Sequence, residues 1–318
     1  MTVATYEDLG CGITRIDSGM IRPGLAALYL VESDGECALV ETGTHHSIPA
    51  VLTLLEQRGI GLQQVKYIIP THVHLDHAGG VGGLMQHCPA ATLLIHPKGA
   101  RHMIDPAKLI AGATVVYGEA RFKELYGEIT PVPESRVQTM ADGATVALGQ
   151  RSLSFYDTPG HARHHFCVRD SLSNGIFTGD TFGLAYPMLT TQQGPFIIPT
   201  TTPVQFEPEA LKDSIRRLLQ LQPARMYLTH YGMVEHPAAL GDSLLQQIDD
   251  YVELVNSAKD TPPEQREDYL VEQLSRYTFA RAREHGCQLD DAALQTELGM
   301  DMRLNGQGLA VWLQSQTD

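Results

Sequence analysis

Short apolar runs divide the first part of the chain into strands. Residues 13–16, 25–31 and 37–40 each have the pattern of a strand, and Ser33-Asp34-Gly35 is a turn signal between the last two. We therefore expect residues 25–40 to form a β-hairpin.

The apolar positions change to helical spacing after this hairpin. Residues 47–58 predict a helix that ends at Gly59. The apolar run 65–69 then predicts a buried strand, residues 81–87 a helix, and residues 92–95 another strand. This alternation predicts an α/β fold in which helices cover a sheet.

The middle of the chain has a helical part followed by further strands. Residues 98–126 are mostly helical in pattern, with interruptions at Pro106 and Gly112. The segments with strand patterns after them are 137–139, 144–148, 152–156, the run Ile176-Phe177-Thr178-Gly179-Asp180, and 225–228.

A long segment without periodicity, residues 181–206, lies between the last two of these strands. Loops of this length in a compact domain usually have a function or are mobile. One interpretation is a wall that faces the substrate, and the other is a plain surface excursion. Pro208 then opens a helix with an apolar stripe.

Strand patterns stop after Gly241. The helical segments that follow are 243–255, one opened by the capping-box pattern Thr261-Pro262-Pro263-Glu264, 290–298 and 308–314. We therefore predict one domain over residues 1–240 and a helical extension over residues 241–318. The extension could cover a site, bind a second subunit in a homodimer, or only pack.

Composition narrows the class of protein. The chain has 318 residues and a net charge of −14, which argues against a nucleic acid or an anionic membrane as partner. Its five cysteines are scattered and form no C-x-x-C pair, so a reducing, cytoplasmic location is predicted. Residues 1–8 lack the pattern of a signal peptide, and no apolar run is long enough to span a membrane.

Four metal-binding side chains crowd the loop after the strand at 65–69. They are His72, His74, Asp76 and His77, all within six positions. His72 and His74 project to the same side of an extended chain, whereas Asp76 and His77 come where a helix should start and can face a second position. A lone histidine at a strand end is usually structural, but a packed core gives no reason for four such residues together. The loop therefore predicts ligands for two adjacent cations, with zinc favoured and iron or manganese as alternatives.

Three more strand ends each deliver one such residue: His161, Asp180 and His230. Each alone is a weak signal, because Gly-Asp is a common turn and a single Thr-His is more often structural. Together with the first loop they make five histidines and two aspartates, all at predicted strand ends.

In this order the seven residues resemble the metallo-β-lactamase superfamily, over roughly residues 12–232. The resemblance implies an αββα sandwich, in which two mixed sheets lie face to face with helices outside and the site at one edge. It also implies the metal ligands: His72, His74 and His161 for the first ion, Asp76, His77 and His230 for the second, and Asp180 as the bridge.

Departures from the pattern narrow the branch. No cysteine is placed near the second metal as in many antibiotic-resistance enzymes, and Thr181 to Tyr186 replaces the Gly-Cys-Gly-Arg-like stretch typical of glyoxalase II and persulfide dioxygenases. Quorum-signal lactonases share the sequence pattern of the loop that contains His72, His74, Asp76 and His77. Glu41 occupies a position at which many members have Asp. We expect this residue to contact the metal ligands rather than to be a ligand itself.

The ligand set predicts hydrolysis at two metals. A hydroxide shared by two cations attacks a carbonyl carbon, and Asp76 orients the nucleophile and takes its proton. Tyr186 or Tyr231 is a candidate donor to the oxyanion. The expected substrate is a small lactone, ester or thioester.

Two other functions remain open from the sequence. Ligands that are all nitrogen and oxygen also suit iron, so an oxygenase or redox enzyme on the same residues is one alternative. A metal-containing effector or binding protein with incidental hydrolysis is the other. His164 and His165 either support a ligand through hydrogen bonds or are exposed histidines.

Overall fold

The computed structural model describes residues 5–202 and 204–316, so what was predicted for residues 1–4, 203 and 317–318 lies outside the described part. The chain forms two compact units. The first consists of Met1–Asp157, His164–Gly179 and Ala224–Glu235, and the second of Thr158–Arg163, Asp180–Pro223 and His236–Asp318. The predicted division near residue 240 stays a prediction.

The first unit contains a seven-stranded mixed sheet, in which the strands follow one another in chain order. Its strands are β1 (Tyr6–Asp8), β2 (Ile13–Asp17), β3 (Ala27–Ser33), β4 (Glu36–Val40), β5 (Val65–Ile69), β6 (Thr92–Ile95) and β7 (Val137–Thr139). Strands β1 to β4 pair antiparallel, and β4 to β7 pair parallel. The hairpin predicted over residues 25–40 is confirmed as β3–β4. Strand β1 was not predicted, because its three residues are exposed and carry no apolar run.

The same unit contains a six-stranded mixed sheet in the order β13-β12-β11-β10-β9-β8. Its strands are β8 (Thr145–Leu148), β9 (Arg151–Asp157), β10 (Phe166–Asp170), β11 (Gly175–Gly179), β12 (Arg225–Leu228) and β13 (Gly232–Glu235). Only β11 and β12 pair parallel. Strands β10 and β13 were missed, because each carries an apolar run too short to stand out. The strands predicted at β8, β9, β11 and β12 are confirmed.

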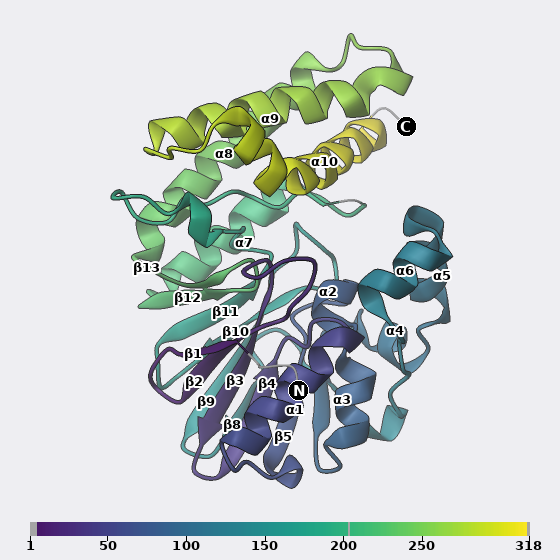
Figure 1. Ribbon diagram of the computed structural model, residues 1–318, viewed down its shortest axis with the longest axis vertical. Helices are drawn as coiled ribbons and strands as arrows, with labels where there is room; N and C mark the ends of the chain where they lie inside the picture. The colour runs from purple at the N-terminus through teal and green to yellow at the C-terminus, as the bar shows by residue number, and fades with distance from the viewer. Residues whose placement is uncertain (1–4, 203, 317–318) are drawn as a thin grey trace. The chain divides into compact units, whose positions relative to one another are not determined.

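Helices cover one face of the seven-stranded sheet (Figure 1). They are α1 (Ile48–Gln57), α2 (Leu75–Ala78), α3 (Val81–His87) and α4 (Ala100–Ile104). The next two helices, α5 (Ala107–Tyr117) and α6 (Glu119–Tyr126), form a separate small cluster in which Phe122 and Tyr126 pack with Leu75 of α2. The predicted interruption at Gly112 is wrong: α5 runs through it, and the helix breaks at Gly118, whose φ of +75° is incompatible with helix.

Strand β3 shows how alternation places the two sheets face to face. Leu28 and Leu30 point into the core under the helices, so Tyr29 between them points the other way. Its ring meets those of Phe177 on β11 and Tyr227 on β12, with centroids 5.2 and 5.6 Å away. Its hydroxyl donates to the Leu228 carbonyl at 2.5 Å. The predicted architecture of two mixed sheets with flanking helices is confirmed.

The second unit is built from the later helices (Figure 1). They are α7 (Pro208–Gln220), α8 (Pro237–Ser257), α9 (Arg266–Glu284) and α10 (Asp291–Ser315). Among the described residues, none of the helices combines the length and apolar character needed to cross a bilayer. The cytoplasmic location stays a prediction.

Two predictions about these helices are wrong. The segments 290–298 and 308–314 belong to one helix, α10, which continues through three glycines. The pattern Thr261-Pro262-Pro263-Glu264 does not cap α9, which begins at Arg266 after a short 3₁₀ turn, Pro263–Gln265. The two prolines favour that turn over a direct helix start, because the residue before a proline is biased away from helical geometry.

Two glycines of α10 predict opposite effects of the same substitution. A Cβ on Gly306 would lie 2.5 Å from Cγ2 and 3.0 Å from the backbone nitrogen of Val271 on α9, whereas on Gly299 it would meet the flexible end of Gln295. Gly306→Ala should therefore lower the free energy of unfolding by about 1–3 kcal/mol through overpacking. Gly299→Ala should raise it by up to about 1 kcal/mol through helix propensity. Urea unfolding of both variants measures the difference, and equal effects would contradict the close contact of α9 and α10.

Candidate metal centre

The loop after β5 brings four of the predicted ligands together in the first unit. His72 and His74 precede α2, and Asp76 and His77 lie within that short helix. The rings of His72 and His77 are fully buried, with centroids 4.0 Å apart, and those of His72 and His74 are 4.4 Å apart. The ligand atoms of His72 and His74 lie within 4.8 Å of each other.

A fifth predicted ligand reaches the same loop from the second sheet of this unit. His230 follows β12, and its Nε2 lies 3.4 Å from Asp76 Oδ2. His77 Nε2 lies 3.5 Å from the same oxygen. Asp76, His77 and His230 thus form a cluster whose ligand atoms are all within 4.8 Å of one another, a spacing that suits one cation.

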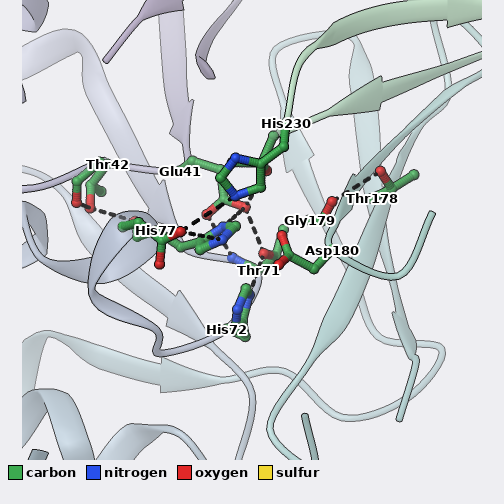
Figure 2. A network of polar contacts seen from close by, with 12 residues as sticks. Glu41, Thr42, Thr71, His72, His77, Thr178, Gly179, Asp180 and His230 are labelled. Atoms are coloured by element: carbon green, nitrogen blue, oxygen red, sulfur yellow. Dashed lines mark hydrogen bonds and ion pairs between the residues drawn. The ribbon is translucent and has the colours of Figure 1, made fainter. Parts of the chain in front are cut away.

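The buried carboxylate of Glu41 forms hydrogen bonds to His77 and to residues next to other ligands of this cluster (Figure 2). Glu41 directly follows β4, at a φ of +62°. It accepts hydrogen bonds from the Thr71 amide at 3.1 Å, the Thr71 hydroxyl at 2.6 Å, His77 Nδ1 at 3.0 Å and the Thr229 hydroxyl at 3.0 Å. One carboxylate therefore holds the residues next to His72 and His230 as well as His77 itself.

These hydrogen bonds set the tautomers of three imidazoles. The Thr71 hydroxyl gives its one proton to Glu41, so it must accept from His72 Nδ1, which lies 3.1 Å away. His77 Nδ1 donates to Glu41, and His230 Nδ1 donates to the Leu25 carbonyl at 2.8 Å. Each ring then presents the lone pair of Nε2, as metal-binding histidines do when an acceptor holds their other nitrogen. The donor set fits a metal.

The remaining two predicted ligands meet in the second unit. His161 Nε2 lies 3.4 Å from Asp180 Oδ2, and both side chains are buried. The Thr200 hydroxyl contacts His161 Nδ1 at 3.1 Å and donates to the Asp180 carbonyl at 3.0 Å. Thr200 thus contacts an imidazole and a backbone carbonyl, whereas Thr71 in the first unit contacts an imidazole and a carboxylate.

Gly179 ends β11 directly before Asp180, and only glycine fits there. Its φ is +49°, and a Cβ would lie 2.4 Å from both His165 Nε2 and the Thr71 hydroxyl. The end of β11 therefore lies against Thr71 and His165 within the first unit.

The interpretation of His164 and His165 as exposed histidines is wrong, because both are buried, at 9% and 0% exposure. The His165 ring lies 4.8 Å from that of His72, and His164 stacks on His72 at 6.2 Å. Burial lowers the pKa of His164 to about 3, so this ring is neutral at physiological pH.

The two tyrosines predicted as oxyanion donors are already hydrogen-bonded. The Tyr186 hydroxyl donates to Asp301 Oδ1 at 2.9 Å, and the Tyr231 hydroxyl donates to Asp17 Oδ2 at 3.1 Å. Burial raises the pKa of Tyr231 to about 12. Either hydroxyl would have to leave its carboxylate to serve a substrate, and both roles stay predictions.

The sequence did not single out the three threonines that support the ligands: Thr71, Thr200 and Thr229. A signal was present for two of them, because Thr71-His72 and Thr229-His230 repeat one dipeptide at two strand ends. Thr200 is 39 residues from His161 along the chain and gave no such signal.

Comparison with known proteins identifies the family. The profile described as Metallo-beta-lactamase superfamily matches residues 21–230. The chain belongs to the metallo-beta-lactamase superfamily. The predicted resemblance and the fold it implied are thereby confirmed.

Similar proteins in this superfamily differ in what their names say they do. The metallo-beta-lactamase fold-containing protein ST1585 of Sulfurisphaera tokodaii is 26% identical over 247 residues, which are 74% of this chain and 84% of that protein. Its solved structure matches with a TM-score of 0.61. Acyl-coenzyme A thioesterase MBLAC2 of Gallus gallus is 26% identical over 193 residues, 55% of this chain and 64% of its own.

A longer match shows that the fold extends over the C-terminal helices. The solved structure of the metallo-beta-lactamase family protein TTHA1429 from Thermus thermophilus covers 98% of this chain and 95% of its own, at 20% identity and a TM-score of 0.67. Distant relatives of the chain also include a hydroxyacylglutathione hydrolase of Salmonella gallinarum. Membership in the metallo-beta-lactamase superfamily, with these His and Asp clusters, makes the chain a metallo-beta-lactamase-fold hydrolase with a metal-binding cluster. The clusters are consistent with the dinuclear metal site typical of that fold.

Proposed function

We propose that the chain is a dinuclear metal hydrolase that cleaves a thioester, ester or lactone of a small molecule. The observation that carries this proposal is the cluster of Asp76, His77 and His230, with its imidazoles fixed by Glu41 and the Leu25 carbonyl. In the proposed assignment His72, His74 and His161 would hold the first ion, Asp76, His77 and His230 would hold the second, and Asp180 would be a ligand of both. Zinc is the proposed metal.

Two bound divalent cations would lower the pKa of a coordinated water and polarise a carbonyl oxygen. The residues supply the rest. Asp76 Oδ2 stands between two imidazole Nε2 atoms, and its side chain is 26% exposed, so it can both bind an ion and take a proton from the attacking water. Because His72 and His77 are buried, bulk water does not compete for the hydrogen bonds that orient their imidazoles.

The choice of an acyl substrate is supported by the relatives. A thioesterase and a hydroxyacylglutathione hydrolase are among the proteins to which the chain is similar at low identity. Thioesters are therefore the first expected substrates, followed by esters and lactones.

The proposed function is tested on purified protein by metal analysis and a substrate panel. We expect about two metal ions per chain, loss of activity after chelation, and recovery when zinc is returned. Acyl-coenzyme A thioesters, p-nitrophenyl esters and lactones of graded chain length form the panel. Fully metallated protein that turns over none of them would contradict the proposal. Oxygen uptake by iron-loaded protein would instead support the redox alternative.

A further inference from the structure

Asn305, near the middle of α10, makes an unusually complete set of hydrogen bonds to one short segment. Its Nδ2 donates to the Pro199 carbonyl at 3.0 Å, and its Oδ1 accepts from the Thr201 amide at 2.7 Å. Its own carbonyl accepts from the Thr201 hydroxyl at 2.9 Å. The side chain is 2% exposed, so these bonds form away from water, where a missing partner is costly.

The residue between these two contacts is Thr200, which touches both predicted metal ligands of this unit. Its hydroxyl lies 3.1 Å from His161 Nδ1 and 3.0 Å from the Asp180 carbonyl. A carbonyl can only accept, and a hydroxyl has one proton. Both contacts are therefore satisfied only when His161 Nδ1 carries the hydrogen and donates it to Thr200. That tautomer presents the Nε2 lone pair on the side of Asp180.

We propose that Asn305 is a positioning residue for the metal ligand His161, acting through the backbone at Pro199 and Thr201 and the hydroxyl of Thr200. This inference rests on the proposed function, because it takes His161 as a ligand. It gives the C-terminal helices a role that the sequence left open: they hold the segment that orients the ligand.

Other contacts in the second unit show that the segment is attached to these helices along its length. Asp301, one turn before Asn305 on the same face of α10, accepts from the Tyr186 hydroxyl. Gln247 of α8 donates to the Ile197 carbonyl at 2.9 Å. The segment predicted as either a wall or a surface excursion is buried over residues 181–186 and 196–201, whereas residues 187–195 are mostly exposed or half-buried.

In the first unit a threonine hydroxyl also supports a histidine ligand, but a different group holds that threonine. There the Thr71 hydroxyl supports His72 and is itself held by the carboxylate of Glu41. At Thr200 the backbone is instead fixed from both sides by the side-chain amide of Asn305. An amide is suited to this place because it offers one donor and one acceptor to a carbonyl and an amide nitrogen two residues apart.

The test uses the full chain and measures metal affinity by competition with a chromophoric chelator, with the Co²⁺ absorption spectrum as a second readout. Asn305→Asp turns the donor facing the Pro199 carbonyl into an acceptor at almost unchanged volume. Thr200→Val removes the hydroxyl, and Thr200→Ser restores it. Gln247→Met is the matched control, because it removes a comparable buried hydrogen bond from a C-terminal helix to the same segment without touching the residues that flank Thr200.

We expect Asn305→Asp and Thr200→Val each to weaken binding of one ion by about 10–100-fold. The double variant should be no weaker than Thr200→Val alone, since both changes act on one path. Thr200→Ser should restore most of the affinity, and Gln247→Met should lower the melting temperature while leaving both affinities and the Co²⁺ spectrum unchanged.

Wild-type affinity in Asn305→Asp, or an equal loss in Gln247→Met, would overturn the inference while the proposed function stands. Should Asn305→Asp not fold, Asn305→Ala replaces it in the same assay, and wild-type affinity there overturns the inference equally. Coupled losses of affinity in a protein that hydrolyses no member of the panel would support the inference and contradict the proposed function. A wild-type chain that binds no metal would contradict both.

Discussion

Asp76→Ala is expected to lower hydrolysis by about 10³–10⁴-fold and to empty the second metal position. The carboxylate lies 3.4 and 3.5 Å from the Nε2 atoms of His230 and His77, so its loss removes a proposed ligand and the proposed base together. Loss of a general base alone accounts for about 10²–10⁴-fold. The measurement is kcat and metal content of the purified variant, compared with the wild-type chain.

Two further variants complete this experiment. One is a control for loss of charge, and the other separates the role of Asp76 as a ligand from its role as a base. Asp157→Ala removes a carboxylate that also pairs with a histidine, His96, at 3.0 Å, and is the control for loss of charge in the same unit. Asp76→Asn keeps the shape but weakens proton transfer, so it should retain more metal than Asp76→Ala at similarly low activity. A folded Asp76→Ala variant with wild-type kcat would show that the base lies elsewhere.

Glu41→Gln is expected to weaken binding of metal by about 10–100-fold although Glu41 is not a proposed ligand. The carboxylate accepts four hydrogen bonds on two oxygens. Glutamine has only one oxygen, so its amide group must face a donor: the Thr71 amide, or the Thr71 and Thr229 hydroxyls with His77 Nδ1. Leaving one buried donor without an acceptor costs about 1–3 kcal/mol, and the imidazole tautomers are no longer fixed.

The matched variant is Glu41→Asp, which keeps the charge and shortens the side chain. We expect it to retain more metal affinity and more activity than Glu41→Gln, because the carboxylate still accepts only. Chelator competition and thermal unfolding, with and without metal, measure the two variants. Glu41→Gln with wild-type affinity would show that the hydrogen bonds of Glu41 stabilise the fold only.

The strands and the ligand loop were predictable because their signals are local. Residues 65–69 and 225–228 are short, mainly apolar runs, and each is followed within two positions by the dipeptide Thr-His. The structure has β5 and β12 over those same residues. Strand β10 was missed because its apolar run, Phe166 to Val168, is only three residues long.

The support from α10 was not predictable, because its partners are distant in sequence. Asn305 meets Thr201 across 104 residues of chain, and only the folded structure brings the two together. Asparagine inside a helix usually indicates nothing more than a polar position. It was likewise not predictable that α10 is a single helix, because glycines usually indicate helix ends. Gly306 is instead required because Val271 of α9 lies too close for a larger side chain.

The two compact units are interleaved along the chain, since each consists of three separate segments. No single cut through the backbone can therefore release either one. A fragment that starts after residue 240 would carry Gln247 and Asn305 without Ile197, Pro199 and Thr201, the groups they bind. Recombination that exchanges the C-terminal helices between relatives must transfer residues 180–223 with them, so these helices and that segment should be inherited as one block.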